Sequence, residues 1–226
     1  AKGAGMIHPD LATLLCFIIT DIGIEKGLLR RALISSAEKS FNSLTIDGDT
    51  STNDSVIILA NGRAGNRLIN GANRDFSRFQ NILDWVMLRL AELIARDGEG
   101  ATKLVRIIVK NAKSALIAKR MARHIASSPL VKTALYGCDP NWGRVMAAIG
   151  SSGTRIDPQR IDIYFGKLRV AKNGEPASFS ERRVKEILKK KEVEIVIDLR
   201  QGSGVATVYT CDLSPDYVKI NSSYMT

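Results

Sequence analysis

Hydrophobic residues recur with two different spacings along this chain of 226 residues. Between residues 74 and 96 they recur at steps of three and four, which is the period of an amphipathic helix. Between residues 193 and 199 they occupy every second position, with Glu194 and Asp198 among the residues between them, which is the period of a strand with one buried face. Both spacings are found without a Pro/Ser-rich linker or an internal repeat between them, so we expect one layered α/β structure.

The same reasoning places the other elements. Apolar runs bounded by turn-forming residues predict buried strands, and amphipathic stretches predict helices. We expect strands at 13–20, 56–59 and 103–110, helices at 25–40 and 113–128, and a loop that leads into a short apolar helix at 139–150. A hairpin at 160–177 with its turn at Asn173 and Gly174, a basic helix at 180–191 and C-terminal strands complete the prediction.

Composition narrows the class of protein. With 45% hydrophobic residues the chain can bury a core, and the apolar stretch at 11–20 is too short to span a bilayer and lacks a signal-peptide cleavage pattern. Three cysteines without framework spacing favour a reducing compartment. We therefore expect a cytoplasmic protein, or an organellar one if the source is eukaryotic, without a membrane partner. Its start at Ala1 suggests a fragment of a longer translation product.

The net charge and the number of possible metal ligands bear on which partners and cofactors the protein binds. A net charge of +10 raises the question of nucleic acid or acidic metabolites as ligands, but no recognition motif accompanies it, so we do not expect nucleic acid as a partner. Only two histidines are present, which leaves too few ligands for a convincing zinc site.

Thr13 lies where a polar, glycine-containing stretch meets the apolar run. Threonine at the start of a buried strand is common for steric reasons, because its branched side chain suits the pleat. The alternative is chemical. If the bond between Ala12 and Thr13 were cut, Thr13 would carry a free α-amine beside its hydroxyl, and that amine would be the base that activates the hydroxyl as a nucleophile.

Four other stretches have both a structural and a chemical interpretation. We read "DGDTSTND" (47–54) as a polar turn rather than a calcium loop, and "GEGATK" (98–103) as a helix end rather than a phosphate loop. Glu99 is nonetheless placed to be held rigidly for a cationic ligand. We read "GCDPNWGR" (137–144) as a loop anchored by Trp142 rather than a base-stacking site, and the basic run at 182–191 as a solvated helix face.

Five motifs occur in order along the chain: "KGAGMIHPDLATLL" (2–15), "DGDTSTNDS" (47–55), "DGEGATK" (97–103), "DPNWGRVMAAIG" (139–150) and "INSSYMT" (220–226). Together they resemble the ornithine acetyltransferase family, the N-acetylornithine:glutamate acetyltransferases of arginine biosynthesis. The resemblance spans essentially the whole chain. It departs from the family at Met225, where an arginine is common.

The resemblance implies a fold and a division of the chain. Family members cut themselves at an Ala–Thr bond, which corresponds here to Ala12–Thr13. Residues 1–12 would then be the tail of an α-chain, and residues 13–226 a β-chain that forms a single α/β domain. The implied fold is the layered sheet-and-helix fold of the ornithine acetyltransferase and N-terminal-nucleophile aminopeptidase type, here lacking most of the α-chain. The implied partner is that α-chain, which supplies an oxyanion-hole Thr-Gly pair, in an α2β2 assembly.

The resemblance also implies the site. Thr13 would be the nucleophile, and Ala12 and Thr13 the cleavage site. Substrate contacts would come from Lys2, Thr13, Glu99, Asn221 and Thr226. By charge, Lys2 suits an α-carboxylate, and Glu99 suits the side-chain ammonium of ornithine. No metal or redox cofactor is implied, and acetyl-CoA is a candidate co-substrate.

The implied reaction moves the acetyl group of N2-acetylornithine to glutamate through an acetyl-threonine intermediate and releases ornithine. The alternative is an N-terminal-nucleophile aminopeptidase or amidase of related architecture, in which water instead of glutamate resolves the acyl-enzyme.

Overall fold

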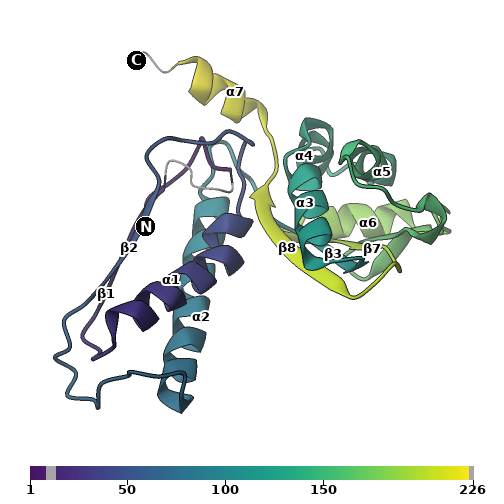
Figure 1. Ribbon diagram of the computed structural model, residues 1–226. Helices are drawn as coiled ribbons and strands as arrows, with labels where there is room; N and C mark the ends of the chain where they lie inside the picture. Colours follow the sequence, from purple (N-terminus) through teal and green to yellow (C-terminus); the bar gives the residue numbers. More distant parts are fainter. Residues whose placement is uncertain (9–13, 224–226) are drawn as a thin grey trace. The chain divides into compact units, whose positions relative to one another are not determined.

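The chain is described here from a computed structural model, which covers residues 1–8 and 14–223. It divides into two compact units, Ala1–Ile94 and Ala95–Thr226 (Figure 1). Within the described residues, no helix combines the length and apolar character that crossing a membrane requires. The boundary between the units lies in a helix, whereas the sequence predicted a cut between residues 12 and 13. That cut, and the single β-chain domain over 13–226, stay predictions.

The first unit is built on two parallel strands. β1 (Leu15–Thr20) pairs with β2 (Ser55–Ala60), so that Phe17 lies opposite Ile57 and Ile19 opposite Leu59. A parallel pair needs a crossover, and the connection between the strands contains α1 (Lys26–Lys39) and the short 3-10 helix η1 (Phe41–Ser43). The long helix α2 (Arg74–Arg96) follows. The helices predicted at 25–40 and 74–96 and the strand at 56–59 are confirmed, and the strand predicted at 13–20 is confirmed from Leu15 onward, while residue 13 lies outside the described residues.

Polar side chains join α1 to α2. Asp84 on α2 accepts hydrogen bonds from Lys39 Nζ at 2.6 Å, Ser36 Oγ at 2.6 Å and Gln80 Nε2 at 2.7 Å. Burial by itself raises the pKa of Asp84, but these three donors and the Lys39 charge outweigh it, so that the pKa lies below its usual value. The carboxylate therefore stabilises the packing of the two helices.

The second unit has a sheet in the order β6-β5-β4-β7-β3-β8. β3 (Leu104–Ala112) and β7 (Glu192–Asp198) are parallel, and the other pairs are antiparallel. The remaining strands are β4 (Asp162–Phe165), β5 (Leu168–Lys172), β6 (Glu175–Pro176) and β8 (Gly204–Cys211). In β7, buried residues alternate with more exposed ones, as the sequence predicted.

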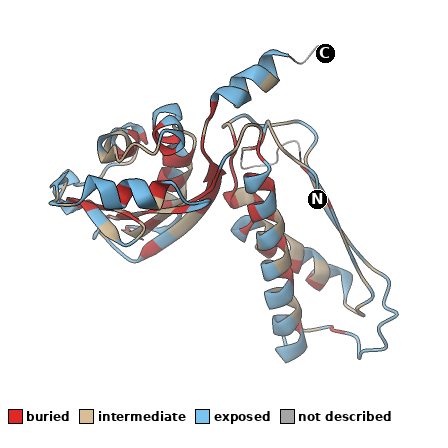
Figure 2. Ribbon diagram, turned by 180° about the vertical axis from the view of Figure 1, so that it is seen from behind, coloured by how far each residue is buried: buried red, intermediate tan, exposed pale blue. Residues whose placement is uncertain are grey.

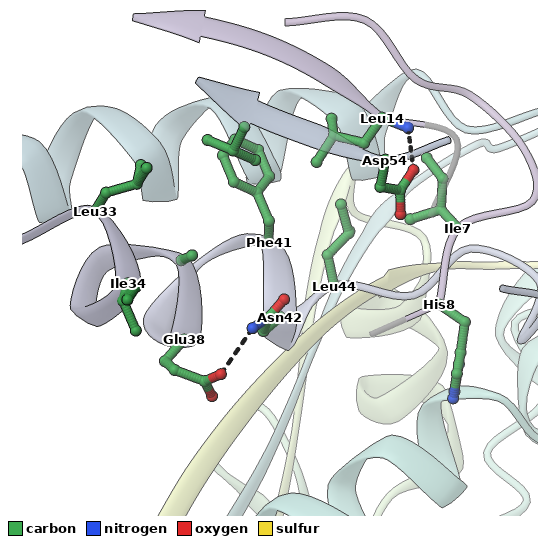
Figure 3. Close-up of a pocket in the computed structure, with 12 residues that line it drawn as sticks. Ile7, His8, Leu14, Leu33, Ile34, Glu38, Phe41, Asn42, Leu44 and Asp54 are labelled. Atoms are coloured by element: carbon green, nitrogen blue, oxygen red, sulfur yellow. Dashed lines mark hydrogen bonds between the residues drawn. The ribbon is translucent and has the colours of Figure 1, made fainter. Parts of the chain in front are cut away.

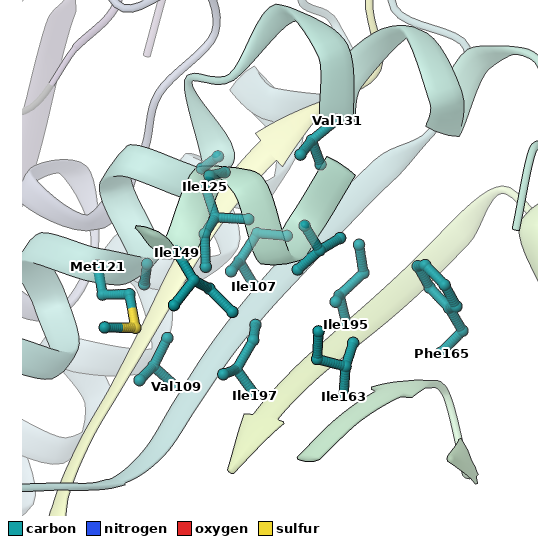
Figure 4. Packing of buried hydrophobic residues seen from close by; sticks show 14 of the residues in the cluster. Ile107, Val109, Met121, Ile125, Val131, Ile149, Ile163, Phe165, Ile195 and Ile197 are labelled. Atoms are coloured by element: carbon teal, nitrogen blue, oxygen red, sulfur yellow. The ribbon is translucent and has the colours of Figure 1, made fainter. Parts of the chain in front are cut away.

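One face of this sheet carries the core. Ile107 lies opposite Ile195, and Val109 and Ile163 both lie opposite Ile197, so these side chains form one apolar layer (Figure 4). Helices pack on that layer: α3 (Ala115–Ala126), α4 (Pro129–Tyr136), α5 (Trp142–Ser151) and α6 (Glu181–Leu188). Each begins at a residue whose side chain accepts a backbone N–H of the first turn: Ser114, Ser128, Asn141 and Ser180.

Three details differ from the sequence-based prediction. α4 and α7 (Pro215–Ser222) were not predicted, because each is only eight residues long and begins at the proline of a Ser-Pro pair that also suits a turn. The predicted hairpin is a three-stranded meander. Its first turn contains Gly166, with φ of 56°, and the predicted turn at Asn173 and Gly174 joins β5 to β6. A 3-10 turn, η2 (Pro158–Arg160), precedes the meander.

Candidate active site

Lys2 is fixed beside the start of β1. Its backbone N–H donates to the Leu15 carbonyl at 2.8 Å, and the Leu15 N–H donates to the Lys2 carbonyl at 3.0 Å. The backbone of Lys2, a predicted substrate contact, is therefore hydrogen-bonded to Leu15. Leu15 is only two positions after the predicted nucleophile, Thr13. Ala12 and Thr13 themselves lie outside the described residues.

The acidic loop at 45–54 holds the chain on both sides of residues 9–13. Asp47 accepts the backbone N–H of Met6 at 2.7 Å and that of Ile7 at 3.0 Å. Asp54 Oδ1 accepts the backbone N–H of Leu14 at 2.5 Å. The polar turn predicted for this loop is confirmed, since Asp47 also accepts the N–H of Asp49. Its carboxylates, however, are used mainly on a segment about 40 residues earlier in the chain.

Asp54 faces a mainly apolar pocket of about 240 Å³ within the first unit (Figure 3). Its second oxygen, Oδ2, is buried and has no hydrogen-bond partner among the described residues. Desolvation by burial raises the pKa of Asp54 to about 6, and the hydrogen bond from Leu14 only partly opposes this. The other titratable side chains that line the pocket are His8, which bonds Thr45 Oγ1 at 3.1 Å, and Glu38.

In the second unit, two predicted substrate contacts meet. Asn221 Nδ2, on α7, donates to Glu99 Oε2 at 2.8 Å and to the Tyr217 carbonyl at 3.0 Å. Glu99 lies in the turn that follows α2, as the helix-end interpretation of this stretch predicted. The two residues are 122 positions apart in sequence. The remaining predicted contact, Thr226, lies outside the described residues.

Gly100 allows α7 to lie against this turn. Its φ is +67°, a conformation that L side chains rarely adopt, and a Cβ at this position would lie 2.5 Å from the Tyr217 nitrogen. Ser214 Oγ donates to the Gly100 carbonyl at 2.6 Å. Glycine is thus required so that α7 can bring Asn221 to Glu99.

Asp212 fixes residues 102 and 103, which follow the turn that contains Gly100. The sequence analysis did not identify this residue. It is buried, and its carboxylate accepts the backbone N–H of Thr102 at 2.8 Å, that of Lys103 at 3.1 Å and the Thr102 hydroxyl. The signal in the sequence is weak, since Asp212 is a single acid directly after a buried strand. Only the contact across 110 residues explains it.

The stretches at 137–144 and 182–191 were interpreted as structural, and the contacts in this unit agree with that interpretation. Trp142 packs against the hydrophobic core at the start of α5, and Arg144 donates to the Leu130 carbonyl at 2.9 Å. The charged residues of the basic run at 182–191 are exposed, whereas Val184 and Leu188 are buried. The run is therefore a solvated helix face up to Leu188, where α6 ends, and residues 189–191 are exposed beyond the helix, which is shorter than the predicted 180–191.

A model of the ArgJ family matches residues 1–226. The chain belongs to the ArgJ family. It is 48% identical over all of its 226 residues to a protein of Oceanobacillus iheyensis named arginine biosynthesis bifunctional protein ArgJ, and 49% identical to the protein of that name from Symbiobacterium thermophilum. In each comparison the chain spans about 56% of the relative's length.

A solved structure agrees with the fold. The crystal structure of the arginine biosynthesis bifunctional protein ArgJ from Bacillus halodurans is similar with a TM-score of 0.91 and 42% sequence identity. The match covers 94% of this chain and all of the crystallised one. The resemblance to the ornithine acetyltransferase family and the layered α/β fold class are thereby confirmed. The site residues inferred from the ArgJ family stay predictions.

Proposed function

We propose that this chain is the β-chain, with the α-chain tail, of an acetyltransferase of arginine biosynthesis that cuts itself between Ala12 and Thr13. The observation that carries this proposal is the match of the whole chain to relatives named for arginine biosynthesis. The geometry supports it, because the segments on both sides of residues 9–13 are held by carboxylates of one loop. A cleavage site needs such fixed flanks, since the nucleophile must be aligned with the bond that it attacks.

The proposed reaction has two half-reactions. The Thr13 hydroxyl attacks the acetyl carbonyl of N2-acetylornithine, and the Thr13 α-amine takes the hydroxyl proton. That proton passes to the departing nitrogen, so that ornithine leaves and acetyl-threonine remains. The amine of glutamate then attacks the ester and regenerates Thr13. These steps need no metal or redox cofactor, and acetyl-CoA is a second candidate donor, in keeping with the word bifunctional in the relatives' names.

The binding residues follow from charge. We assign Lys2 to the α-carboxylate of the substrate and Glu99 to the side-chain ammonium of ornithine. Glutamate carries the opposite side-chain charge, so Glu99 cannot favour both substrates. Asn221 is bonded to Glu99 at 2.8 Å and offers a neutral donor and acceptor beside it. Together with Thr226, it would make the pocket tolerant of both side chains.

The proposed partner is the α-chain of the same precursor, in an α2β2 assembly. The outer face of the β1–β2 pair is apolar and uncovered: Phe17 is 60% exposed and Ile19 79%. Leu15, Ile57 and Leu59 of the same two strands are also exposed. Two strands with a solvent-exposed apolar face are only marginally stable in water. Since the chain spans about 56% of its relatives' length, we assign this face to the part of the precursor that is absent here.

We place the protein in the cytoplasm, or in an organelle if its source is eukaryotic. All three cysteines, Cys16, Cys138 and Cys211, are free, which suits a reducing compartment.

The test of the proposed function is Thr13→Ala in the full-length precursor. Removing the hydroxyl removes the nucleophile for both cleavage and transfer, so we expect an uncut precursor by intact mass and no detectable acetyl transfer. Thr50→Ala, an exposed position in the acidic loop, is the matched control and should be cut and active. A Thr13→Ala protein that is processed normally would contradict the proposal.

The aminopeptidase or amidase alternative is separated by the acceptor. Cleaved enzyme incubated with N2-acetylornithine should yield N-acetylglutamate only when glutamate is added. Release of acetate at the same rate without glutamate would instead favour the hydrolase.

A further inference from the structure

The net charge of this chain is confined to its second unit. The first unit, Ala1–Ile94, has ten basic and ten acidic residues, whereas Ala95–Thr226 has 23 basic and 13 acidic ones. The densest part is the segment 167–191, with nine basic and three acidic residues. The acetyl transfer proposed above uses none of these side chains. A surface with such an excess of positive charge concentrates anions around it.

This segment forms a groove of about 810 Å³ within the second unit. Residues of β5, of β6, of the connection at 177–180 and of the first turn of α6 line it. Three of the lining side chains are cations, Arg169, Lys172 and Arg183, and one is an acid, Glu175. The volume lies within the range of small-molecule sites, about 300 to 1,000 Å³. The groove is therefore large enough for a small anionic ligand and carries the charge to attract one.

The cations of the groove are poorly compensated. Lys172 and Arg183 are exposed, and neither side chain forms an ion pair in the part of the chain that the structure describes. Glu175 lies opposite Lys172 in the β5–β6 pair but is not bonded to it. Arg169 contacts the buried carboxylate of Asp162 at 3.5 Å, and a second arginine contacts the same carboxylate at 3.2 Å. The groove thus keeps a net positive charge.

An apolar wall lies beside these cations. Leu168 and Phe179 line the groove and are only partly buried where they pack against the core. A ring of a ligand can rest on such a surface, and an aromatic ring can stack on Phe179. An inorganic anion has no use for this wall. A nucleic acid strand stacks on a series of aromatic side chains, and Phe179 is the single aromatic residue among those that line the groove in the described chain.

We propose that this groove binds the diphosphate group of a nucleotide through its three cations and places the base against Phe179 and Leu168. Arginine and lysine are the side chains that bind phosphate oxygens, arginine through two parallel hydrogen bonds. Two molecules share this chemistry: a free nucleoside diphosphate and coenzyme A, which contains an adenosine diphosphate group. The inference does not rest on the proposed acetyl transfer.

Paired substitutions separate the groove from the general charge of the surface. Lys172→Glu with Arg183→Glu reverses two charges that line the groove. Lys185→Glu with Lys189→Glu reverses two exposed charges that do not line it, and so it changes the net charge by the same amount. All four positions are exposed, so both proteins should fold. Phe179→Leu keeps an apolar side chain and removes the aromatic ring.

The experiment is a calorimetric titration of the cleaved full-length protein with ADP, coenzyme A and inorganic pyrophosphate at low salt. We expect ADP to bind, with affinity about tenfold lower or more in the groove pair and within about twofold of wild type in the control pair. Phe179→Leu should weaken ADP binding by about three- to tenfold and leave pyrophosphate binding unchanged. Glu175→Gln removes the acid of the groove and should tighten ADP binding.

The comparison of ADP with coenzyme A identifies the source of the nucleotide. Tighter binding of coenzyme A assigns the groove to a coenzyme A compound, and tighter binding of ADP assigns it to a free nucleotide; either result supports the inference. Transfer of acetyl from N2-acetylornithine to glutamate should be unchanged in both charge-reversal pairs. If the wild type lacks that transfer, the proposed function fails while the binding result stands.

Several results would overturn the inference. Absence of binding of both ADP and coenzyme A to the wild type removes the site. An equal loss of affinity in the two charge-reversal pairs shows that only net charge attracts the ligand. Pyrophosphate binding as tight as that of ADP, with no effect of Phe179→Leu, shows a site for a bare anion. Binding of a single-stranded oligonucleotide without binding of ADP or coenzyme A shows a nucleic acid surface instead.

Discussion

Three aspartates show how far the surroundings of a residue decide its role. Asp47 accepts two backbone N–H groups of residues 6 and 7, and Asp212 accepts backbone N–H groups and a hydroxyl of residues 102 and 103, so each carboxylate fixes a distant chain segment. Asp54 fixes one N–H and keeps a buried oxygen without a donor among the described residues. The side chain is the same in each case. The number of donors that the fold brings to the carboxylate decides how many of its oxygen atoms have a hydrogen-bond partner.

A prediction at this scale concerns Gly100. Alanine at this position has to adopt a positive φ and approaches the Tyr217 nitrogen to 2.5 Å, so we expect the free energy of unfolding to fall by about 2 kcal/mol or more. Gly153→Ala is the matched control, because Gly153 has φ of +68° but nothing within 4 Å of the added Cβ. Urea unfolding of both variants isolates the steric part. Equal losses would show that α7 does not need the close approach.

Individual elements differ in how completely their own unit covers them. In the second unit, helices cover the apolar face of the sheet, and the strands there are largely buried (Figure 2). In the first unit, α1 and α2 line pockets with Leu14, Val56 and Ile58, but the opposite face of β1 and β2 stays exposed. In Figure 2 these two strands are mainly exposed or intermediate. Parallel strands with apolar side chains on both faces are usually buried on both sides.

The prediction at this scale concerns assembly with the α-chain. Ile19→Lys places a charge on the uncovered face of β1, where burial would desolvate it, so we expect the cleaved chains to separate and transfer activity to be lost. Leu116→Lys is the control, since Leu116 is 78% exposed on α3, close to the 79% of Ile19. Size-exclusion chromatography of the cleaved proteins measures the outcome. Normal co-elution with Ile19→Lys would remove this face as the α-chain contact.

At the scale of the whole molecule, each unit contains a carboxylate that favours the folded state at neutral pH. Hydrogen bonds and ion pairs with Arg96 and Arg106 lower the pKa of Glu192 in the second unit. In the first unit, hydrogen bonds from Lys39, Ser36 and Gln80 lower the pKa of Asp84. A lowered folded-state pKa gives stability above the unfolded-state pKa, which is lost as the pH falls through the folded value. Asp54 has the opposite sign: with its pKa raised to about 6, its contribution falls as the pH rises from about 4 to 6.

We therefore expect Asp84→Asn to reduce stability at pH 7 and to flatten the loss of stability below about pH 4. The physical reason is that Lys39, Ser36 and Gln80 no longer share a charged acceptor. Asp75→Asn is the control, because Asp75 is 63% exposed and its pair with Arg78 is 3.8 Å long. Unfolding curves at pH 3 to 7 measure the difference. An unchanged pH dependence in Asp84→Asn would contradict the assigned cause.

The sequence by itself determined the local structure and the family. Periodicity predicted a helix at residues 74–96, where α2 lies, and a strand at residues 193–199, where β7 (Glu192–Asp198) lies. The reason is that buried side chains repeat with the period of their own element. The surrounding residues drew attention to Thr13 and Glu99, and the resemblance to the family added Lys2 and Asn221. What only the tertiary structure decided are contacts between distant segments: Asp54 with Leu14, Asp212 with Thr102 and Asn221 with Glu99. No local spacing encodes such pairs, since a hydrogen bond between distant segments depends on where the rest of the chain folds.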